Sequence, residues 1–334
     1  MKVGIIGLPN VGKSSLFNLL TEAHAQVAKF PFTTIDRNVG MVSIPDNRIE
    51  RIVEITKSPK MKYASIEFVD IAGLIQDAHK GEGLGNKFLS HIRDVDLIVH
   101  VLRCFMAPDV AHTSSILSPR DDYTIVRTEL LLSDLEIVER RMAKIRKVAE
   151  FHDEMERLSK VKDALSQGEA PGEPHIELPL LTPKPEIIVL NLDDEGKFQN
   201  GIDGYRISVA LEEEITEFDE DEKTELRKDA GVEMEGPAGF IKLCLERLNM
   251  MLFYTIKGEE ARAWPVQEGT KMIDAAGKIH TDMQKGFIKA EVLTYDDFIK
   301  VGGFVEAQNL GLSKIEGKEY IVQDGDIILI KFRV

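Results

Sequence analysis

The sequence predicts an α/β protein with a mostly parallel sheet, an inserted α-helical hairpin and a small C-terminal α+β domain. Three observations support this prediction. Strand-like apolar runs alternate with helical stretches up to about residue 120. Residues 121–165 show helical spacing with many charges, and alternating strand patterns return after residue 264. The 334 residues, of which 43% are hydrophobic, are enough for two or three cores.

The first element is a strand, a loop and a helix. Residues 7–14, Gly-Leu-Pro-Asn-Val-Gly-Lys-Ser, fit the pattern of a phosphate-binding loop. The apolar run 2–6 predicts a buried strand before it, and 15–21 predict a helix after it. Backbone N–H groups can then surround phosphate oxygens at the helix N-terminus, with Lys13 neutralising charge during catalysis. The residues expected to bind nucleotide are Asn10, Val11, Gly12, Lys13, Ser14 and Ser15.

An acidic residue follows the next strand-like run, 66–69. Asp70 and Gly73 stand where P-loop proteins place an acid near Mg²⁺ and a glycine N–H that senses the γ-phosphate, a catalytic role. The loop 30–35, Phe-Pro-Phe-Thr-Thr-Ile, offers two hydroxyls, and Thr34 is expected to complete the Mg²⁺ shell. An ordinary strand entry is the alternative interpretation of this loop. The predicted metal ligands are Ser14, Thr34 and Asp70.

Leu74 occupies the position at which many GTPases carry a glutamine that orients the attacking water. A leucine cannot hydrogen-bond water, so either hydrolysis is slow or another residue does this work. Three glycines in the following segment, 80–88, allow several backbone conformations at low steric cost. That freedom suits a segment that reorders with the nucleotide state.

These motifs together resemble the YchF, or Obg-like ATPase, family of P-loop NTPases, along nearly the whole chain. The segments that carry the resemblance are 7–14, 30–35, 70–74, 80–89 and 101–105. The resemblance implies a P-loop NTPase G domain, a helical-hairpin insertion, a C-terminal TGS domain and a function connected with translation. It also implies that His112, in the loop after Arg-Cys-Phe, replaces the missing glutamine in catalysis. A solvated loop histidine is the alternative.

The base-binding residues are expected at the end of another apolar run, 187–190. GTPases carry Asn-Lys-x-Asp at this point, and the aspartate accepts two hydrogen bonds from guanine. Here Leu192 replaces the lysine. The resembling family has Asn-x-x-Glu and prefers ATP, whereas this chain keeps Asp194, so we expect ATP to be preferred with GTP use open. The residues expected around the base are Asn191, Leu192, Asp194, Ser208, Val209 and Ala210.

Asn10 is a candidate ligand for a K⁺ ion. Several GTPases that lack the glutamine have an asparagine three residues before the loop lysine, where it helps to hold K⁺. Such an ion would supply the positive charge that an arginine finger otherwise brings. The alternative is an asparagine that only caps the loop.

Residues 121–165 predict two paired helices, because apolar residues step by three and four with charges between them. Prolines between 171 and 185 end this arm, which is shorter than the resemblance leads us to expect of bacterial members. The first helix ends in a run without acids that is either a solvated face or a contact for ribosomal RNA. Its basic residues are Arg140, Arg141, Lys144, Arg146 and Lys147.

The last part of the chain predicts a small α+β domain. Residues 240–254 predict a buried helix, and a helix near 275–283 lies among strand patterns. Asp324-Gly325 between apolar runs predicts a hairpin. Residues 280–288 resemble a TGS domain of β-grasp fold, within which His280 and Asp282 are expected to fix a turn rather than bind metal.

The predicted G domain comprises residues 1–120 and 184–258, the arm 121–183 and the TGS domain 259–334. The net charge of −15 argues against a protein coated with basic surface. Cys104 and Cys244 lie far apart and indicate a reduced, cytoplasmic setting. No apolar run approaches the roughly 18 residues that would span a membrane, and we expect a monomer.

The sequence therefore predicts a ribosome-associated switch that binds and slowly hydrolyses ATP, with GTP use open. Its ions are Mg²⁺ and, in the potassium interpretation, K⁺. One alternative is a nucleotide-gated RNA- or ribosome-binding protein with negligible catalysis, which Leu74 favours. Another is a small-molecule kinase, but the sequence shows neither an arginine-bearing lid nor an acceptor pocket.

Overall fold

The computed structural model describes residues 1–25, 39–71, 84–106, 117–146, 151–172, 176–193 and 201–333. These residues form two compact units. The first holds the described residues of 1–23, 39–41 and 67–240, and the second those of 24–25, 42–66 and 241–333.

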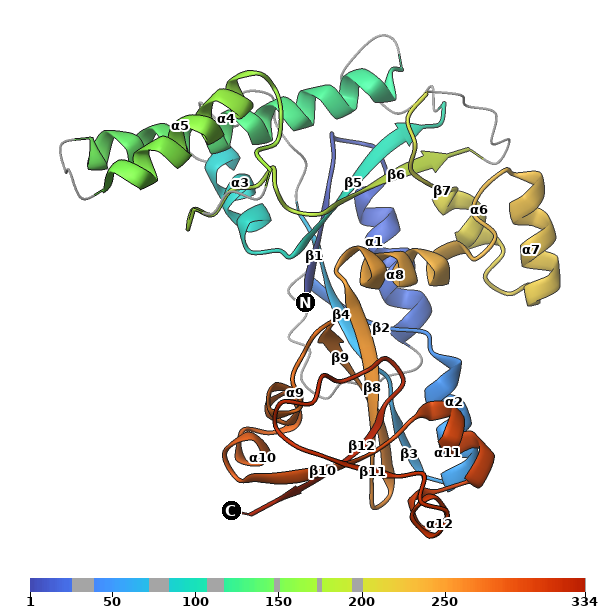
Figure 1. The fold of residues 1–334 in the computed structure, drawn as a ribbon. Helices are drawn as coiled ribbons and strands as arrows, with labels where there is room; N and C mark the ends of the chain where they lie inside the picture. The colour runs from blue at the N-terminus through green and yellow to red at the C-terminus, as the bar shows by residue number, and fades with distance from the viewer. Residues whose placement is uncertain are drawn as a thin grey trace. The chain divides into compact units, whose positions relative to one another are not determined.

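The first unit is built on a six-stranded sheet in the order β2-β4-β1-β5-β6-β7 (Figure 1). The pairs β1–β4, β1–β5, β5–β6 and β6–β7 are all parallel, which confirms the predicted mostly parallel sheet. All eight residues of β5 are buried, as expected of a strand with helices on both faces. The strands are β1 Lys2–Ile6, β2 Val39–Ser43, β4 Ser65–Asp70, β5 Leu97–Cys104, β6 Glu186–Leu192 and β7 Tyr205–Ile207.

Helices follow most of these strands, as parallel connections require. The helix α1 starts at Lys13, within the predicted phosphate-binding loop 7–14, and its residues Leu16 and Leu20 are fully buried. The stretch 211–235, which is rich in acidic residues, contributes to two short helices, and the second of them begins with a capping box between Asp219 and Glu222. The helices besides the arm are α1 Lys13–Ala25, α3 Leu84–Arg93, α6 Val209–Glu214, α7 Glu220–Asp229 and α8 Gly236–Arg247.

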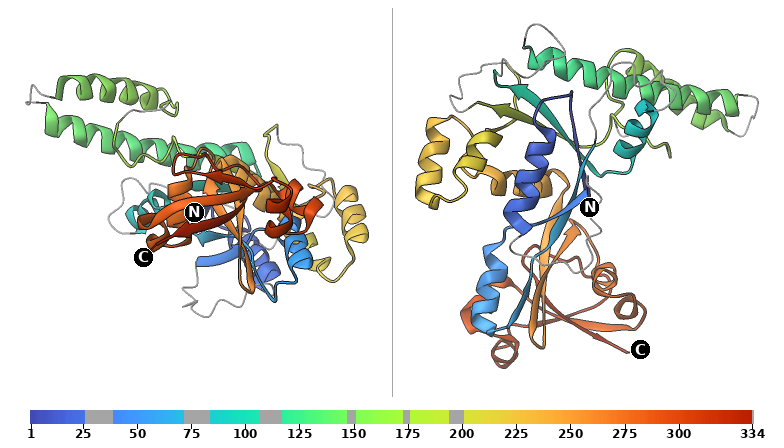
Figure 2. Two further views of the ribbon diagram at one scale, coloured as in Figure 1. Left: turned by 60° about the horizontal axis from the view of Figure 1, so that its bottom comes forward. Right: turned by 180° about the vertical axis from the view of Figure 1, so that it is seen from behind.

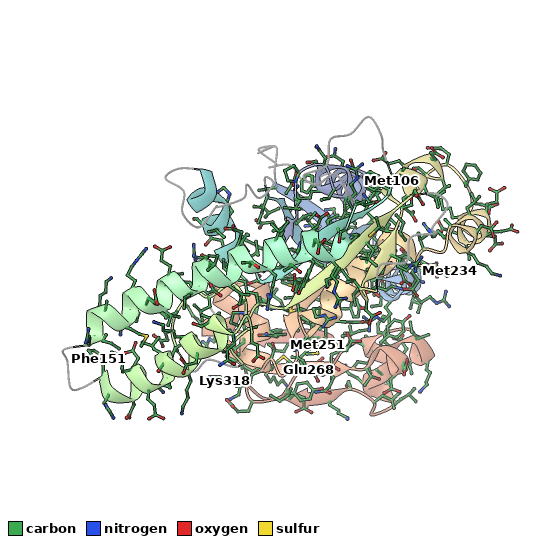
Figure 3. The ribbon with its side chains drawn as sticks, turned by 90° about the horizontal axis from the view of Figure 1, so that it is seen from above. Met106, Phe151, Met234, Met251, Glu268 and Lys318 are labelled. Carbon is green, nitrogen blue, oxygen red and sulfur yellow. The ribbon has the colours of Figure 1, made fainter. Side chains whose placement is uncertain are left out.

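The predicted helical arm is present as α4, Pro119–Ile145, and α5, His152–Ser166, which lie side by side in both views of Figure 2. Ser118 caps α4, and Pro119 occupies its first turn. The first half of α4 packs on β5, and its second half shares an apolar cluster with α5 that includes Val138, Leu158 and Leu165. Phe151 lies at the end of the arm that is remote from the sheet (Figure 3).

A buried carboxylate fixes the point where the chain returns from the arm to the sheet. Asp134 of α4 is fully buried and accepts hydrogen bonds from the backbone N–H groups of Leu181 and Thr182 at 2.8 Å. The Thr182 hydroxyl donates to the same carboxylate at 2.7 Å. Burial raises the pKa of Asp134, and these donors oppose the shift.

The second unit has its own six-stranded sheet, in the order β11-β10-β12-β8-β9-β3. It mixes parallel and antiparallel pairs and packs against short helices, which confirms the predicted α+β class. Its strands are β3 Lys60–Lys62, β8 Met250–Lys257, β9 Glu260–Gln267, β10 Phe287–Leu293, β11 Lys314–Glu316 and β12 Ile327–Phe332. Its helices are α2 Asn47–Thr56, α9 Met272–Ile279, α10 Thr281–Lys285, α11 Tyr295–Val301 and α12 Phe304–Asn309.

Residues 42–66 belong to this second unit although they lie between two strands of the first sheet. The strand β3 pairs in parallel with β9, from Lys60 opposite Glu260 to Lys62 opposite Arg262. Asp46 caps α2 and also accepts a hydrogen bond from the buried Tyr254 hydroxyl. Burial together with Asp46 raises the pKa of Tyr254, which therefore stays protonated as the donor.

The structure draws the domain boundary differently from residue 258 of the sequence analysis. That position separates β8 from β9, yet the two strands pair in register from Met250 to Lys257. The predicted helix over 240–254 is wrong beyond Arg247, because Asn249 adopts a left-handed φ of 51° and the chain then enters β8. Neither feature was visible in the apolar pattern, since a short apolar run fits a buried strand or a buried helix.

The predicted hairpin at Asp324-Gly325 is also wrong. The turn is present, but β12 after it pairs with β10 and β8 rather than with the residues before the turn. The Asp324 carboxylate accepts from Arg48 Nη1 at 2.6 Å and from the Leu252 N–H at 2.9 Å. These long-range partners fix the turn to α2 and β8. His280 does fix a turn as predicted, because its Nδ1 accepts from the Asp282 N–H at 3.2 Å and caps α10.

Replacing Asp134 tests the anchor of the arm. Asp134→Ala leaves two buried N–H groups without an acceptor, which we expect to cost about 3 kcal/mol locally. Hydrogen exchange of the Leu181 and Thr182 amides should then accelerate by about 100-fold. Thr182→Val, which removes only the hydroxyl donor, should accelerate it much less. Unchanged exchange in Asp134→Ala would show that the carboxylate does not hold this segment.

Candidate nucleotide-binding site

The loop between β1 and α1 curls in the way that a phosphate-binding loop requires. Gly7, Asn10 and Gly12 all have positive φ, at 149°, 63° and 95°. Such residues let a short loop bend so that its N–H groups converge on one point. A Cβ on Gly7 would lie 2.5 Å from the carbonyl oxygen of Val101, so β5 approaches the loop closely at this residue.

Lys13 lies over this loop. Its ammonium group donates to the carbonyl oxygen of Leu8 at 2.8 Å, and only 7% of the residue is exposed. Burial lowers the pKa of Lys13, and the charge of Asp70 acts in the opposite direction. A partly desolvated cation with one neutral acceptor is poised to gain an anionic partner, which is the chemistry of phosphate binding.

Ser14 and Asp70 meet because β1 and β4 are paired in parallel, with Ile5 opposite Asp70. The Ser14 hydroxyl donates to Asp70 Oδ2 at 2.6 Å. The other carboxylate oxygen, Oδ1, is buried and has no hydrogen-bond donor among the described residues. A hydroxyl and a carboxylate with a free oxygen are ligands that suit a hard divalent cation such as Mg²⁺.

Asn191 holds the loop from the other side. Its Nδ2 donates to the carbonyl oxygen of Val11 at 3.0 Å, and its Oδ1 accepts from the Val209 N–H at 3.2 Å. A Cβ on Gly12 would lie 2.3 Å from that Nδ2. The buried amide thus joins the loop, β6 and the start of α6, a bridging role that the sequence analysis missed.

Family models match two parts of the chain. One described as a 50S ribosome-binding GTPase matches residues 2–140. One for the YchF GTPase C-terminal domain, described as a protein of unknown function, matches residues 250–333. The Bacillus subtilis protein named ribosome-binding ATPase YchF is 39% identical, with each chain covered in full. The chain belongs to the YchF family.

Further relatives agree with this assignment. The Haemophilus influenzae ribosome-binding ATPase YchF is 40% identical over all of this chain and 99% of its own length. The solved structure of the Schizosaccharomyces pombe YchF GTPase has a TM-score of 0.84 at 31% identity, covering 99% of this chain and 97% of that one. The alignment with the Bacillus subtilis protein spans 366 positions, so that YchF protein carries residues that this 334-residue chain lacks.

The predicted base-binding residues do not all point to one place. Leu192 is buried in an apolar cluster with Leu102, Leu190 and Leu211, so its side chain belongs to the core beneath β6. Ser208 caps α6 by accepting from the Leu211 N–H at 3.3 Å. Val209 is buried, and Ala210 is exposed. In the loop, Val11 is buried, whereas Asn10 and Ser15 are exposed.

Several predicted site residues lie outside the described residues. They are Thr34, Gly73, His112, Lys147 and Asp194. Their roles stay predictions.

The basic end of α4 is partly neutralised. Arg141 makes two hydrogen bonds to Glu154 of α5, at 2.7 and 2.9 Å, and Arg140 pairs with Glu136 on its own helix. Lys144 and Arg146 are exposed. Two of the described cations at this end of α4 are thus exposed to solvent, and two already have carboxylate partners.

Across the described ranges, no group of three or more His, Cys, Asp or Glu side chains could hold a metal ion by itself. No helix in the part of the chain that the structure describes combines the length and apolar composition needed to cross a bilayer.

The contact between Gly12 and Asn191 predicts a coupled pair. Gly12→Ala places a methyl group against Nδ2 at a positive φ, and we expect a loss of about 2 kcal/mol in the free energy of unfolding without nucleotide. Asn191→Ala leaves buried partners unsatisfied and should cost a similar amount. The double variant should cost at least 1 kcal/mol less than the sum, as measured by urea denaturation. Additive losses would contradict the direct contact.

Proposed function

We propose that the chain is a ribosome-associated nucleotide switch that binds ATP at the loop of residues 7–14 and hydrolyses it slowly. The observation that supports this most directly is the convergence of Lys13, Ser14 and Asp70 around the curled loop. Family membership supports the same function, because the bacterial relatives are named ribosome-binding ATPases.

Each residue has a distinct part in this proposal. Lys13 neutralises the charge of the β- and γ-phosphates, and the loop N–H groups surround their oxygens. Ser14 and Asp70 hold Mg²⁺, with Thr34 as a further ligand when the γ-phosphate is present. Mg²⁺, when bound by these residues, would offset the negative charge of the phosphates. The N–H of Gly73 senses the γ-phosphate. When hydrolysis removes the γ-phosphate, the segments around Thr34 and Gly73 are released.

Hydrolysis is slow in this proposal because Leu74 cannot orient water. His112 is the candidate for that role, since an imidazole can position a water molecule once it reaches the site. A K⁺ ion near Asn10 is a second candidate contribution. The alternative, a nucleotide-gated RNA- or ribosome-binding protein, differs only in that it hydrolyses a negligible amount of nucleotide. Leu74 is the residue that favours this alternative.

The base preference is proposed from residues 191–194. Leu192 cannot provide the lysine that packs on guanine, and its side chain lies in the core. The missing lysine and the resemblance to an ATP-preferring family favour ATP, whereas Asp194 keeps the carboxylate that guanine would use, so GTP is accepted less well.

The proposed partners are the ribosome and its RNA, reached through Arg140, Arg141, Lys144, Arg146 and Lys147 and through the C-terminal domain, which we assign to the TGS type. The protein then acts as a monomer in the cytoplasm.

Nucleotide titrations test the binding site. Lys13→Ala should weaken ATP binding by about 100-fold or more, because it removes the buried charge that faces phosphate. Ser14→Ala should abolish the Mg²⁺ dependence of that affinity. Asn18→Ala, an exposed change on the same helix, serves as the control. Titrations of the parent with ATP and GTP give the base preference, and unchanged affinity in Lys13→Ala would overturn the proposed site.

Single-turnover phosphate release tests catalysis. We expect slow release from ATP that ribosomes accelerate and that His112→Ala reduces with little effect on ATP affinity. Replacing K⁺ by Na⁺ should slow turnover if the ion lies beside Asn10. No release with or without ribosomes, in a protein that still binds ATP, would favour the gated binding protein over the enzyme.

A further inference from the structure

One end of the second sheet carries a set of cations on a single face. The register between β3, β9 and β8 aligns Lys60, Glu260 and Lys257 in one row. Two residues further on, it aligns Lys62 and Arg262 with Thr255. Residues in register across strands, and residues two apart along one strand, share a face of the sheet. Four cations and one carboxylate therefore lie together.

An aromatic ring continues this face. Trp264 is the next residue of β9 on the same side, and its ring stacks on Phe253 with centroids 6.4 Å apart. The Arg262 guanidinium lies over the Trp264 ring, 3.9 Å from its centroid. The indole N–H donates to the Thr255 hydroxyl at 2.9 Å. The Arg262 guanidinium carbon thus lies against the ring, and both residues are half-buried.

The two faces of these strands have different surroundings. The opposite face presents the buried Ala261 and Ala263, and α2 packs on β9 there. On the cationic face, the core beside α9 covers Phe253 and Val266 but not the row of Lys60 and Lys257, which are exposed. The face therefore passes from core to solvent along β9.

Most of these charges have no carboxylate partner. Lys62 pairs with Glu260 at 3.0 Å, but no ion pair involves Lys60, Lys257 or Arg262 within the described ranges. On the arm, four cations, Arg140, Arg141, Lys160 and Lys162, are paired with glutamates, whereas Lys144 and Arg146 are exposed. On a chain of net charge −15, this local excess of cations is the better match for phosphate.

Protection of a sheet edge explains only part of the pattern. Lysines on an edge strand such as β3 discourage pairing with other chains. Lys257 and Arg262 are on the inner strands β8 and β9, where no edge needs protection. A stacked guanidinium also has no part in such protection.

We propose that this basic sheet face (Lys60, Lys62, Lys257, Arg262 and Trp264) binds single-stranded RNA. The three lysines contact successive backbone phosphates, and a base stacks on the Arg262 guanidinium beside the Trp264 ring. Lysines facing phosphates beside a planar stacking group are the combination that single-stranded RNA binding uses. The inference rests on the proposed ribosomal function and names the surface by which the C-terminal unit meets RNA.

The first test uses a fluorescein-labelled 20-nucleotide single-stranded RNA of mixed sequence. Binding is followed by anisotropy at several salt concentrations. Lys60→Ala/Lys62→Ala/Lys257→Ala should weaken binding at least tenfold and make the slope of log K against log salt about 2 less negative. The control Lys285→Ala/Lys314→Ala/Lys318→Ala removes the same charge from exposed positions of the same unit. Equal losses in both triple variants would overturn the proposal.

Arg262→Lys separates stacking from charge. It should weaken RNA binding about tenfold while leaving the salt slope unchanged, because the charge remains and the stacking plane is lost. Trp264 is the chain's single tryptophan, so its fluorescence reports on this face directly. RNA should change the emission of the parent protein, and an unchanged emission at saturating RNA would contradict the proposal. An unlabelled RNA duplex that competes as well as the single strand would overturn the single-strand assignment.

Ribosome sedimentation distinguishes this proposal from the proposed function. Co-sedimentation should be weakened in the lysine triple variant but kept in the control triple, with ATP binding equal in both. A parent protein that does not co-sediment would contradict the ribosomal function itself. A parent and a lysine triple variant that co-sediment equally would leave that function in place and overturn this surface.

Discussion

The candidate site depends on the parallel register of the first sheet. Because β4, β1, β5 and β6 all run in the same direction, their carboxyl ends meet at one edge. This register sets Asp70 beside the loop that follows β1, and Asn191 beside Arg103 at the end of β5. A shift of β4 or β6 by one residue would turn Asp70 or Asn191 to the other face of the sheet. A reversed strand would place that side chain at the opposite edge. The short hydrogen bond between Ser14 and Asp70 is the direct result.

Two side chains then hold the loop from opposite sides. Asp70 reaches the first turn of α1 through Ser14, and Asn191 reaches the loop backbone through Val11. Both partners come from strands distant in sequence, and these hydrogen bonds form without a ligand. Such preorganisation reduces the entropy that binding must otherwise cost. The free Oδ1 of Asp70 is the one buried carboxylate oxygen without a donor among the described residues, and it lies where a cation is expected.

The segment from residue 42 to 66 connects this site with the second unit through the chain itself. In the sequence it lies between Thr34 and Asp70, yet it belongs to the same compact unit as the C-terminal sheet. Pairing of β3 with β9, the Tyr254–Asp46 hydrogen bond and the Arg48–Asp324 ion pair all hold it there. The basic sheet face includes β3 for the same reason. The strand β4, which ends in Asp70, and the strand β3 of the basic sheet face therefore belong to one continuous stretch of sequence.

The sequence by itself determined those features in which local chemistry is sufficient. The pattern at residues 7–14 needs only a strand before it and a helix after it. In 121–165, apolar residues recur every three or four positions between charged ones, and pairing two helices buries those apolar residues. Tertiary structure decided the rest. Asn191 donates a hydrogen bond to Val11, and Leu192 lies in the core. Asp324 accepts from Arg48, and β3 pairs with β9 of the second sheet although it lies between strands of the first in the sequence. These outcomes depend on which distant groups meet when the sheets form, because a buried polar atom takes whichever partner the fold brings within reach, and no pattern of neighbours along the chain records that partner.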